Sequence, residues 1–190
     1  DVYKRQHHQG KMDFWSSYKD EETMRKNWEI ITEYCIGKKG NLVKFWSGAD
    51  PQKQGFTSDG VVVGQTWDGP IVSMMKAGEP VAYQTTDEGA LAWVDGITLS
   101  AKADNIDEAY ELINYSFTPE IGGKTINEIG YNSAVIGASD HYTDETKAIS
   151  QAIYPGDTAS KLNAWPPEPP WFADARAESV SYTHLRAHET

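Results

Sequence analysis

A tryptophan and an aspartate stand two residues apart in the segment AWVDG, residues 92–96. In a strand, residues two apart point to the same face, so Trp93 and Asp95 are expected side by side. An indole ring attracts an organic cation over its face, and a carboxylate accepts the hydrogen bonds of an ammonium group. The alternative is a core tryptophan beside a strand-end aspartate that binds a loop amide. Taken alone, the two residues slightly favour this core arrangement over a cation-binding site.

Three further side chains stand where the chain is expected to turn. Trp67 follows the β-branched run at 61–66, and open α/β sheets bind ligands beyond the carboxyl ends of their strands. Its ring either lines such a crevice or packs against the following helix. Tyr131 follows a helix-stopping glycine, and Ser47 follows the run NLVKFW. A surface position for the tyrosine and turn capping by the serine are the structural alternatives.

Enzyme motifs are absent from the sequence. It contains no GxGxxG, P-loop, GxSxG or HExxH pattern. Glu88 and Asp95 could be a glycosidase pair, but paired carboxylates are common in so acidic a chain and nothing places these two across a sugar. The single cysteine, Cys35, excludes an internal disulfide and a cysteine-based zinc cage. We therefore expect no catalytic residue, no metal and no cofactor.

The charge of the chain restricts its partners. Its 190 residues include 17 Lys+Arg against 28 Asp+Glu, which gives a net charge of -11, and most of the excess acid lies within residues 45–175. This balance disfavours nucleic acid and anionic membranes, and it favours a cationic ligand or simple solubility. No stretch approaches the ~20 apolar residues that a membrane helix needs.

The two ends resemble translated sequencing-adapter sequence. Residues 1–6 (DVYKRQ) and residues 180–190 (VSYTHLRAHET) have neither helical nor alternating apolar order, and we interpret both as artefacts. This interpretation removes His184 and His188, whose spacing on a helix would suit a metal pair. Without the ends and the histidines beside residue 6, only His141 remains, which leaves almost nothing for a histidine-based site.

The elements that must position the candidate residues follow from capping and apolar spacing. The clearest helix begins at Asn105, where Glu108 completes a capping box. The segment 165–171 (WPPEPPW) is expected to be extended, because its four prolines remove backbone donors. Since strands and helices alternate, the expected fold class is α/β, a mixed sheet flanked by helices. The predicted helices are 20–36, the segment between Pro70 and Gly78, 105–117, 118–129 and 143–153; the predicted strands are 41–46, 61–66, 80–85 and 91–99, with a polar loop at 47–60.

Five short motifs follow one another along the chain: WDG at 67–69, EGALAWVDG at 88–96, NIDEAYELINY at 105–115, TPE at 118–120 and IGYNS at 129–133. In this order and spacing they resemble the periplasmic spermidine/putrescine-binding proteins of ABC importers. That family has a two-lobed type II periplasmic binding protein fold, with the ligand held between the lobes. The resemblance implies a non-enzymatic, periplasmic protein that captures polyamines for an ABC permease.

The resemblance also implies roles for individual residues. Trp67 is similar to a tryptophan that flanks the polyamine methylenes, and Trp93 to a second aromatic wall. Asp95 resembles the carboxylate that anchors an amine, and Tyr131 resembles a tyrosine that lines the cleft. Ser47, on weaker alignment, is similar to a serine near one end of the ligand.

One departure from the family concerns the acids near Trp67. Some relatives carry an acidic residue three places after this tryptophan, where Pro70 stands here. Asp68 either substitutes for that acid as a possible ligand contact or only caps the helix. The number of amines in the ligand, and so the choice between putrescine and spermidine, depends on which role holds.

The resemblance covers roughly the C-terminal half of such a protein. It implies a second-lobe portion at 7–93, a return crossing and part of the first lobe at 94–138, and a segment returning to the second lobe at 139–179. We attribute the lack of a signal peptide to truncation, and we expect a monomer at full length. The alternatives are a receptor for another small organic cation or an amino-acid derivative, an extracellular carbohydrate-binding domain, and a structural module that buries both tryptophan rings.

Overall fold

The computed structural model describes residues 9–188, and their side chains as far as residue 181. Helices dominate this part of the chain, and two short strands make up its sheet. In chain order the elements are η1 (Phe14–Tyr18), α2 (Glu21–Ile36), η2 (Lys39–Asn41), α3 (Ala49–Thr57), α4 (Asp68–Lys76), β1 (Ala90–Ala92), α5 (Ile106–Ser116), α6 (Pro119–Ile129), η3 (Ala138–His141), α7 (Asp144–Ile153), η4 (Thr158–Lys161), β2 (Leu162–Ala164) and α8 (Phe172–His188).

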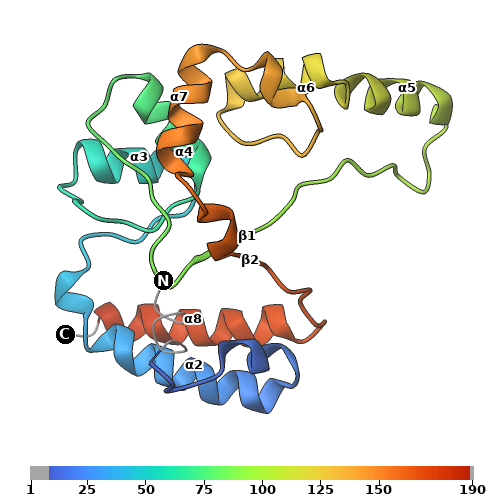
Figure 1. Ribbon diagram of the computed structural model, residues 1–190. Coiled ribbons are helices and arrows are strands. Elements are labelled where there is room, and N and C mark those ends of the chain that lie inside the picture. The colour runs from blue at the N-terminus through green and yellow to red at the C-terminus, as the bar shows by residue number, and fades with distance from the viewer. Residues whose placement is uncertain (1–8, 189–190) are drawn as a thin grey trace.

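The elements form two groups with the small sheet between them (Figure 1). The lower group holds η1 and the adjacent helices α2 and α8, whereas α3, α4, α6 and α7 make up the upper group. The strands β1 and β2 pair in parallel, with Ala90 opposite Leu162 and Ala92 opposite Ala164. Helix α5 projects from the upper group beyond α6 (Figure 1). The sheet therefore lies where the chain passes between the groups.

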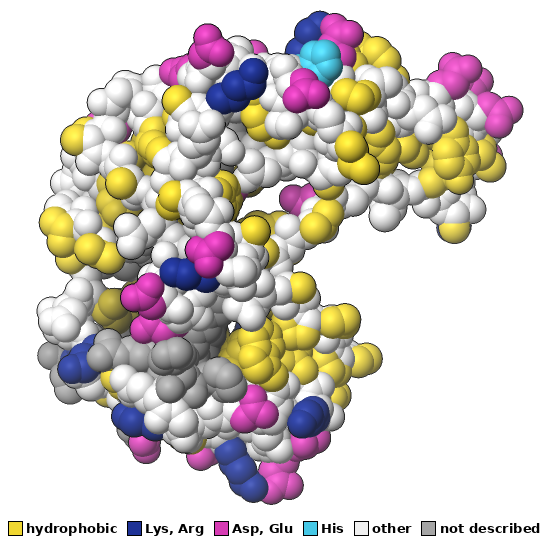
Figure 2. All heavy atoms as spheres, in the orientation of Figure 1, with side chains coloured by type: hydrophobic (Ala, Val, Ile, Leu, Met, Phe, Trp, Pro, Cys, Tyr) yellow, Lys and Arg dark blue, Asp and Glu magenta, His cyan; other side chains and the backbone are white. Residues whose placement is uncertain are grey.

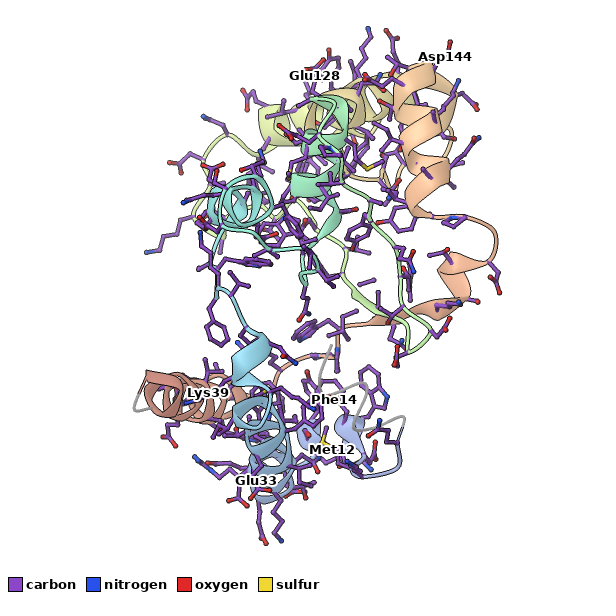
Figure 3. The ribbon with its side chains drawn as sticks, turned by 90° about the vertical axis from the view of Figure 1, so that its left-hand side faces the viewer. Met12, Phe14, Glu33, Lys39, Glu128 and Asp144 are labelled. Atoms are coloured by element: carbon purple, nitrogen blue, oxygen red, sulfur yellow. The ribbon has the colours of Figure 1, made fainter. Side chains whose placement is uncertain are left out.

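The lower group has its apolar core between α2 and α8. Asp20 caps α2 by accepting a backbone hydrogen bond in its first turn at 2.8 Å. In that turn Met24 is fully buried against Phe172 of α8. Met12 and Phe14 form an adjoining cluster with α2, and Figure 3 shows both beside that helix. The residues before α2 thus help to hold the lower group together.

The upper group is packed through the apolar face of α4 and through small residues of α6. Ile71, Val72 and Met74 of α4 are buried. A Cβ atom at Gly123 of α6 would lie 2.5 Å from the carbonyl oxygen of Ala138, so a glycine is required for the close contact between α6 and η3. In this group α6 therefore packs closely on η3, and α4 lies against α3 and α7.

Three of the predicted strands are wrong. Residues 41–46, 61–66 and 80–85 carry no strand pairing in the described part of the chain. The side chains of Val62 and Val63 are 92% and 88% exposed, although their β-branched run predicts a buried strand. A strand needs a partner for its backbone groups, and within residues 9–188 only β1 and β2 provide one to each other.

Two other segments differ from the prediction. The expected strand at 91–99 pairs only within β1, and the expected loop at 47–60 contains the helix α3. Asp50 and Pro51 stand in the first turn of α3, where an acid and a proline favour a helix start. Pro51 therefore lies in a helix start within the segment that we expected to be a polar loop.

The predicted helices are confirmed as α2, α4, α5, α6 and α7, and the proline-rich segment 165–171 has neither helix nor strand, as expected. The capping box does not form, because the Asn105 side chain makes no capping hydrogen bond. Two of the apolar side chains at helical spacing in this segment are exposed, Leu112 at 65% and Phe117 at 51%. The α/β class is confirmed in a coarse form, a helix-rich arrangement with a small parallel sheet.

The ends of the chain fall partly outside the described residues. Helix α8 continues to His188, so the backbone from residue 180 is helical where we expected no helical order. Residues 1–6 and the side chains of His184 and His188 lie outside the described part. Among the helices that the structure describes, none combines the length and apolar character needed to cross a membrane.

Candidate functional site

Trp67 and Tyr131 meet at the start of α4. The indole Nε1 of Trp67 donates a hydrogen bond to the hydroxyl oxygen of Tyr131 at 2.9 Å. Trp67 is the extended residue before the first turn of α4, and Tyr131 follows Gly130, whose φ of 77° ends α6. Tyr131 is 37% exposed, so the pair reaches the surface. Two aromatic residues that we selected separately from the sequence therefore form one pair.

A glycine in the first turn of α4 makes this pairing possible. A Cβ atom at Gly69 would lie 2.5 Å from Cζ of Tyr131. At Gly130, a Cβ atom would lie 2.7 Å from Cγ1 of Val72. Contacts this short are not tolerated, so the two glycines allow the loop after α6 to lie directly on the first turns of α4. The geometry of the aromatic pair depends on that close approach.

Asp68 uses both carboxylate oxygens within the protein. Its Oδ1 accepts the backbone N–H of Gly69 at 3.0 Å, and its Oδ2 accepts the hydroxyl of Tyr154 at 2.8 Å. Burial raises the pKa of Tyr154, and the hydrogen bond to Asp68 raises it further. Burial and the nearby Asp68 charge also raise the pKa of Tyr83. Of these two phenols, Tyr154 is the one that donates a hydrogen bond to the Asp68 carboxylate.

Trp93 and Asp95 lie in the extended segment just beyond β1. Trp93 is 55% exposed and Val94 is 82% exposed, and Asp95 is exposed as well. The structural alternative of a core tryptophan is therefore wrong for Trp93. Among the described residues, no hydrogen bond or ring contact joins Trp93 or Asp95 to the Trp67–Tyr131 pair. Of the predicted site residues, the structure brings Trp67 and Tyr131 together. Trp93 and Asp95 are exposed to solvent.

Ser47 is exposed and directly precedes Gly48, whose φ of 95° comes before the first residue of α3. The strand that we expected to end at this serine does not form. Its position as a ligand contact remains a prediction.

Tyr154 and Asn132 belong to the same cluster but were not selected from the sequence. The hydroxyl of Tyr154 donates to Asp68, and the Asn132 side chain lies near enough to affect the pKa of Tyr154. Tyr154 follows the last residue of α7, as Tyr131 follows the glycine that ends α6. The signal that selected Tyr131, an aromatic residue with a polar tip just past a helix, was therefore present at Tyr154 too.

Two hollows in the described surface involve other residues. One, of about 40 Å³, lies in the aromatic core of the lower group, and the other, of about 580 Å³, is open to solvent at the junction of α5 and α6. The first is lined by Phe14, Tyr18, Trp28, Trp165, Phe172 and Arg176, and the second by Tyr115, Thr118, Pro119, Glu120, Ile121, Lys124 and His141. None of the predicted ligand residues lines either hollow. Among the side chains that the structure describes, no group of three or more His, Cys, Asp or Glu residues is arranged to hold a metal ion.

Comparison with known proteins assigns the chain to a class. Residues 8–152 match the family described as bacterial extracellular solute-binding protein. This match covers most of the chain, so the chain belongs to that family, whose members bind solutes and are not enzymes. The resemblance inferred from the motifs between residues 67 and 133 is confirmed at this level.

Individual relatives agree with this assignment. The chain is 31% identical to spermidine/putrescine-binding periplasmic protein 1 of Haemophilus influenzae over 133 residues, which are 70% of this chain and 36% of the relative. It is 28% identical to the spermidine/putrescine-binding periplasmic protein of Escherichia coli over 105 residues, or 55% and 30% of the two chains. It is also 30% identical to the putrescine-binding periplasmic protein PotF of Escherichia coli over 87 residues, or 46% and 24%. The chain thus spans about a third of the length of these curated relatives, and no solved structure gives a significant match.

Proposed function

We propose that this chain is part of an extracytoplasmic receptor that captures polyamines, such as spermidine or putrescine, for import through an ABC permease. The observation that carries the proposal is the Trp67–Tyr131 pair, which reaches the surface at the start of α4 in a chain whose named relatives bind polyamines. In this proposal Trp67 and Trp93 cover the methylenes, Asp95 anchors an ammonium group, and Tyr131 and Ser47 line the cleft.

The chemistry of the ligand suits these residues. A polyamine is a slender chain of methylenes between groups that are protonated at neutral pH. Rings cover methylenes well, and each charge taken from water needs a carboxylate partner. Asp95 is exposed and Trp93 is more than half exposed, so both are available to a ligand. The net charge of -11 adds a long-range attraction for a cation.

We further propose a two-lobed type II fold for the complete protein, of which this chain supplies the second-lobe portion at 7–93, the crossing and part of the first lobe at 94–138, and the returning segment at 139–179. The relatives' greater length supports this division. Apolar side chains gather around the hollowed side of the molecule (Figure 2). In the segment after β1, Val94 is 82% exposed and Ile97 is 54% exposed. In the complete protein, closure of the lobes would bring Trp93 and Asp95 toward Trp67, with Gly96 as a flexible point.

The test is titration calorimetry on the protein encoded by the complete gene, with spermidine, putrescine, an amino acid and maltose as separate ligands. For at least one polyamine we expect a dissociation constant in the micromolar range or tighter, which corresponds to a binding free energy on the order of −8 kcal/mol. We expect no binding of maltose. Binding of maltose without binding of either polyamine would contradict the proposal and favour a carbohydrate-binding protein. Binding of the amino acid in preference to both polyamines would favour the other alternative.

A further inference from the structure

Tyr154 lies between the two segments that carry the Trp67–Tyr131 pair. Its hydroxyl donates to Oδ2 of Asp68 at 2.8 Å, and the side chain of Asn132 lies near enough to affect the pKa of Tyr154. Asp68 directly follows Trp67 in the chain, and Asn132 directly follows Tyr131. The phenol therefore binds the residue next to Trp67 and lies near the residue next to Tyr131.

Both carboxylate oxygens of Asp68 have partners within the protein. Its other oxygen, Oδ1, accepts the Gly69 backbone N–H at 3.0 Å, and Asp68 is partly buried. An ionised carboxylate has about four acceptor sites, so an ammonium group at Asp68 would share the carboxylate with these two internal donors in a partly buried place. Asp95, by contrast, is exposed, and no described hydrogen bond occupies its carboxylate.

The packing around Tyr131 makes the Trp67–Tyr131 hydrogen bond sensitive to the position of Tyr154. The Tyr131 ring lies against the first turn of α4 because Gly69 has no side chain to displace it, and its hydroxyl receives the Trp67 indole N–H at 2.9 Å. The Trp67–Tyr131 hydrogen bond therefore depends on the position of the loop relative to α4. Tyr154 acts on that position from α7, which also contacts α4.

We propose that Tyr154 and Asp68 are positioning residues, which hold Trp67 and Tyr131 in a fixed mutual geometry, and that Asp68 is not itself a polyamine ligand. The claim that Asp68 is not a polyamine ligand rests on the proposed function and deepens it. Of the two acids that stand beside the tryptophans in sequence, only Asp95 is then available to bind an ammonium group.

The first experiment measures the indole signal of Trp67 by NMR in the full chain without ligand. The signal is identified by its loss in Trp67→Phe, and its exchange with water reports the hydrogen bond to Tyr131. We expect Tyr154→Phe to speed this exchange about two- to tenfold, toward the rate in Tyr131→Phe, because about 0.5–1.5 kcal/mol of ordering is lost. Tyr110→Phe is the control, since it removes a tyrosine hydroxyl from an exposed residue of α5, the helix that projects beyond α6 (Figure 1). This control should leave the Trp67 signal unchanged.

Variants of Asp68 test the same hydrogen bond from the side of its acceptor. Asp68→Ala should speed the exchange as Tyr154→Phe does, and the double variant should change it no further, because both remove the same hydrogen bond. Asp68→Asn keeps an acceptor oxygen and should restore most of the protection. If Tyr154→Phe fails to fold, the comparison of Asp68→Ala with Asp68→Asn decides the question. Unchanged exchange in Tyr154→Phe, or full additivity of the two variants, would overturn the positioning role.

The ligand arm uses the complete protein and spermidine. Tyr154→Phe should weaken binding about two- to tenfold through lost ordering of the aromatic pair. Asp68→Asn should cost no more than that, whereas Asp95→Asn should cost far more. An Asp68→Asn loss as large as that of Asp95→Asn would overturn the claim that Asp68 is no ligand. If wild type binds no polyamine while the indole results hold, the proposed function fails and the positioning role stands.

Discussion

The ring of Tyr18 is stacked on the ring of Phe172, with 4.5 Å between the centroids and 12° between the planes. Tyr18 ends η1 near the start of the described chain, whereas Phe172 begins α8 near its end and is 1% exposed. Met24 of α2 packs against Phe172 as well. The lower group is therefore held together by contacts between residues that are far apart in sequence.

Replacement of Phe172 should destabilise this group strongly. Phe172→Ala removes a buried ring and leaves a cavity, which costs about 3–5 kcal/mol. The matched control is Phe117→Ala, because Phe117 is 51% exposed and should lose less than about 1 kcal/mol. Urea unfolding followed by circular dichroism measures both. Equal losses in the two variants would contradict the packing described here.

Stability should fall at alkaline pH through Tyr18. Burial and, to a smaller extent, the charge of Glu168 raise the pKa of Tyr18 from 10.0 to about 12, while Arg176 opposes the shift. A phenol with a raised pKa contributes stability that is complete below pH 10 and is lost as the pH rises toward 12. The loss should be about 1 kcal/mol after allowance for solvent screening. Tyr18→Phe should have a flatter profile between pH 9 and pH 11.5 than wild type; identical slopes would exclude Tyr18 as the source.

Gly69→Ala should separate Trp67 from Tyr131. The new Cβ would lie 2.5 Å from Cζ of Tyr131, so the ring must move, at a cost of about 1–3 kcal/mol. The control is Gly40→Ala, where a Cβ meets no atom within 4 Å. Tryptophan fluorescence and the exchange of the Trp67 indole hydrogen should change in the first variant only. An unchanged Trp67 signal in Gly69→Ala would show that the pair does not depend on this close approach.

Asp95→Asn should weaken polyamine binding by the complete protein more than any single aromatic replacement. Loss of one partner of a buried charge pair costs roughly 2–5 kcal/mol, which is about 30-fold or more in affinity. Asp104→Asn is the control, since Asp104 is an exposed acid that we assign no ligand role. Titration calorimetry with spermidine measures both. Wild-type affinity in Asp95→Asn would remove this residue from the site.

Local signals predicted the helices well. The cap at Asp20, Pro70 in the first turn of α4, the left-handed Gly130 after α6 and the cap at Thr143 each act within a single turn of their helix. Strands were predicted poorly, because a run such as residues 61–66 becomes a strand only if another segment pairs with it. Within the described chain no segment does so for that run.

In the candidate site, too, residue types were predictable from local sequence, whereas contacts between distant segments were not. Trp67, Tyr131 and Asp95 were selectable from residue type, from position near a turn, and from ordered motifs that mark the solute-binding family. The hydrogen bond between Trp67 and Tyr131 was not, because it depends on how α6 packs on α4. Tyr154 was missed for a related reason, since its importance comes from Asp68 and Asn132 and not from its own segment.

The sequence alone determined the family, the helices α2, α4, α5, α6 and α7 and the residue types suited to a cation, since motif order, capping and charge are properties of neighbouring residues. Tertiary structure decided which of those residues meet. It paired Trp67 with Tyr131, joined Asp68 to Tyr154 and left Trp93 and Asp95 open to solvent. These outcomes depend on contacts between distant segments, whose cost in chain entropy is repaid only when whole elements pack together.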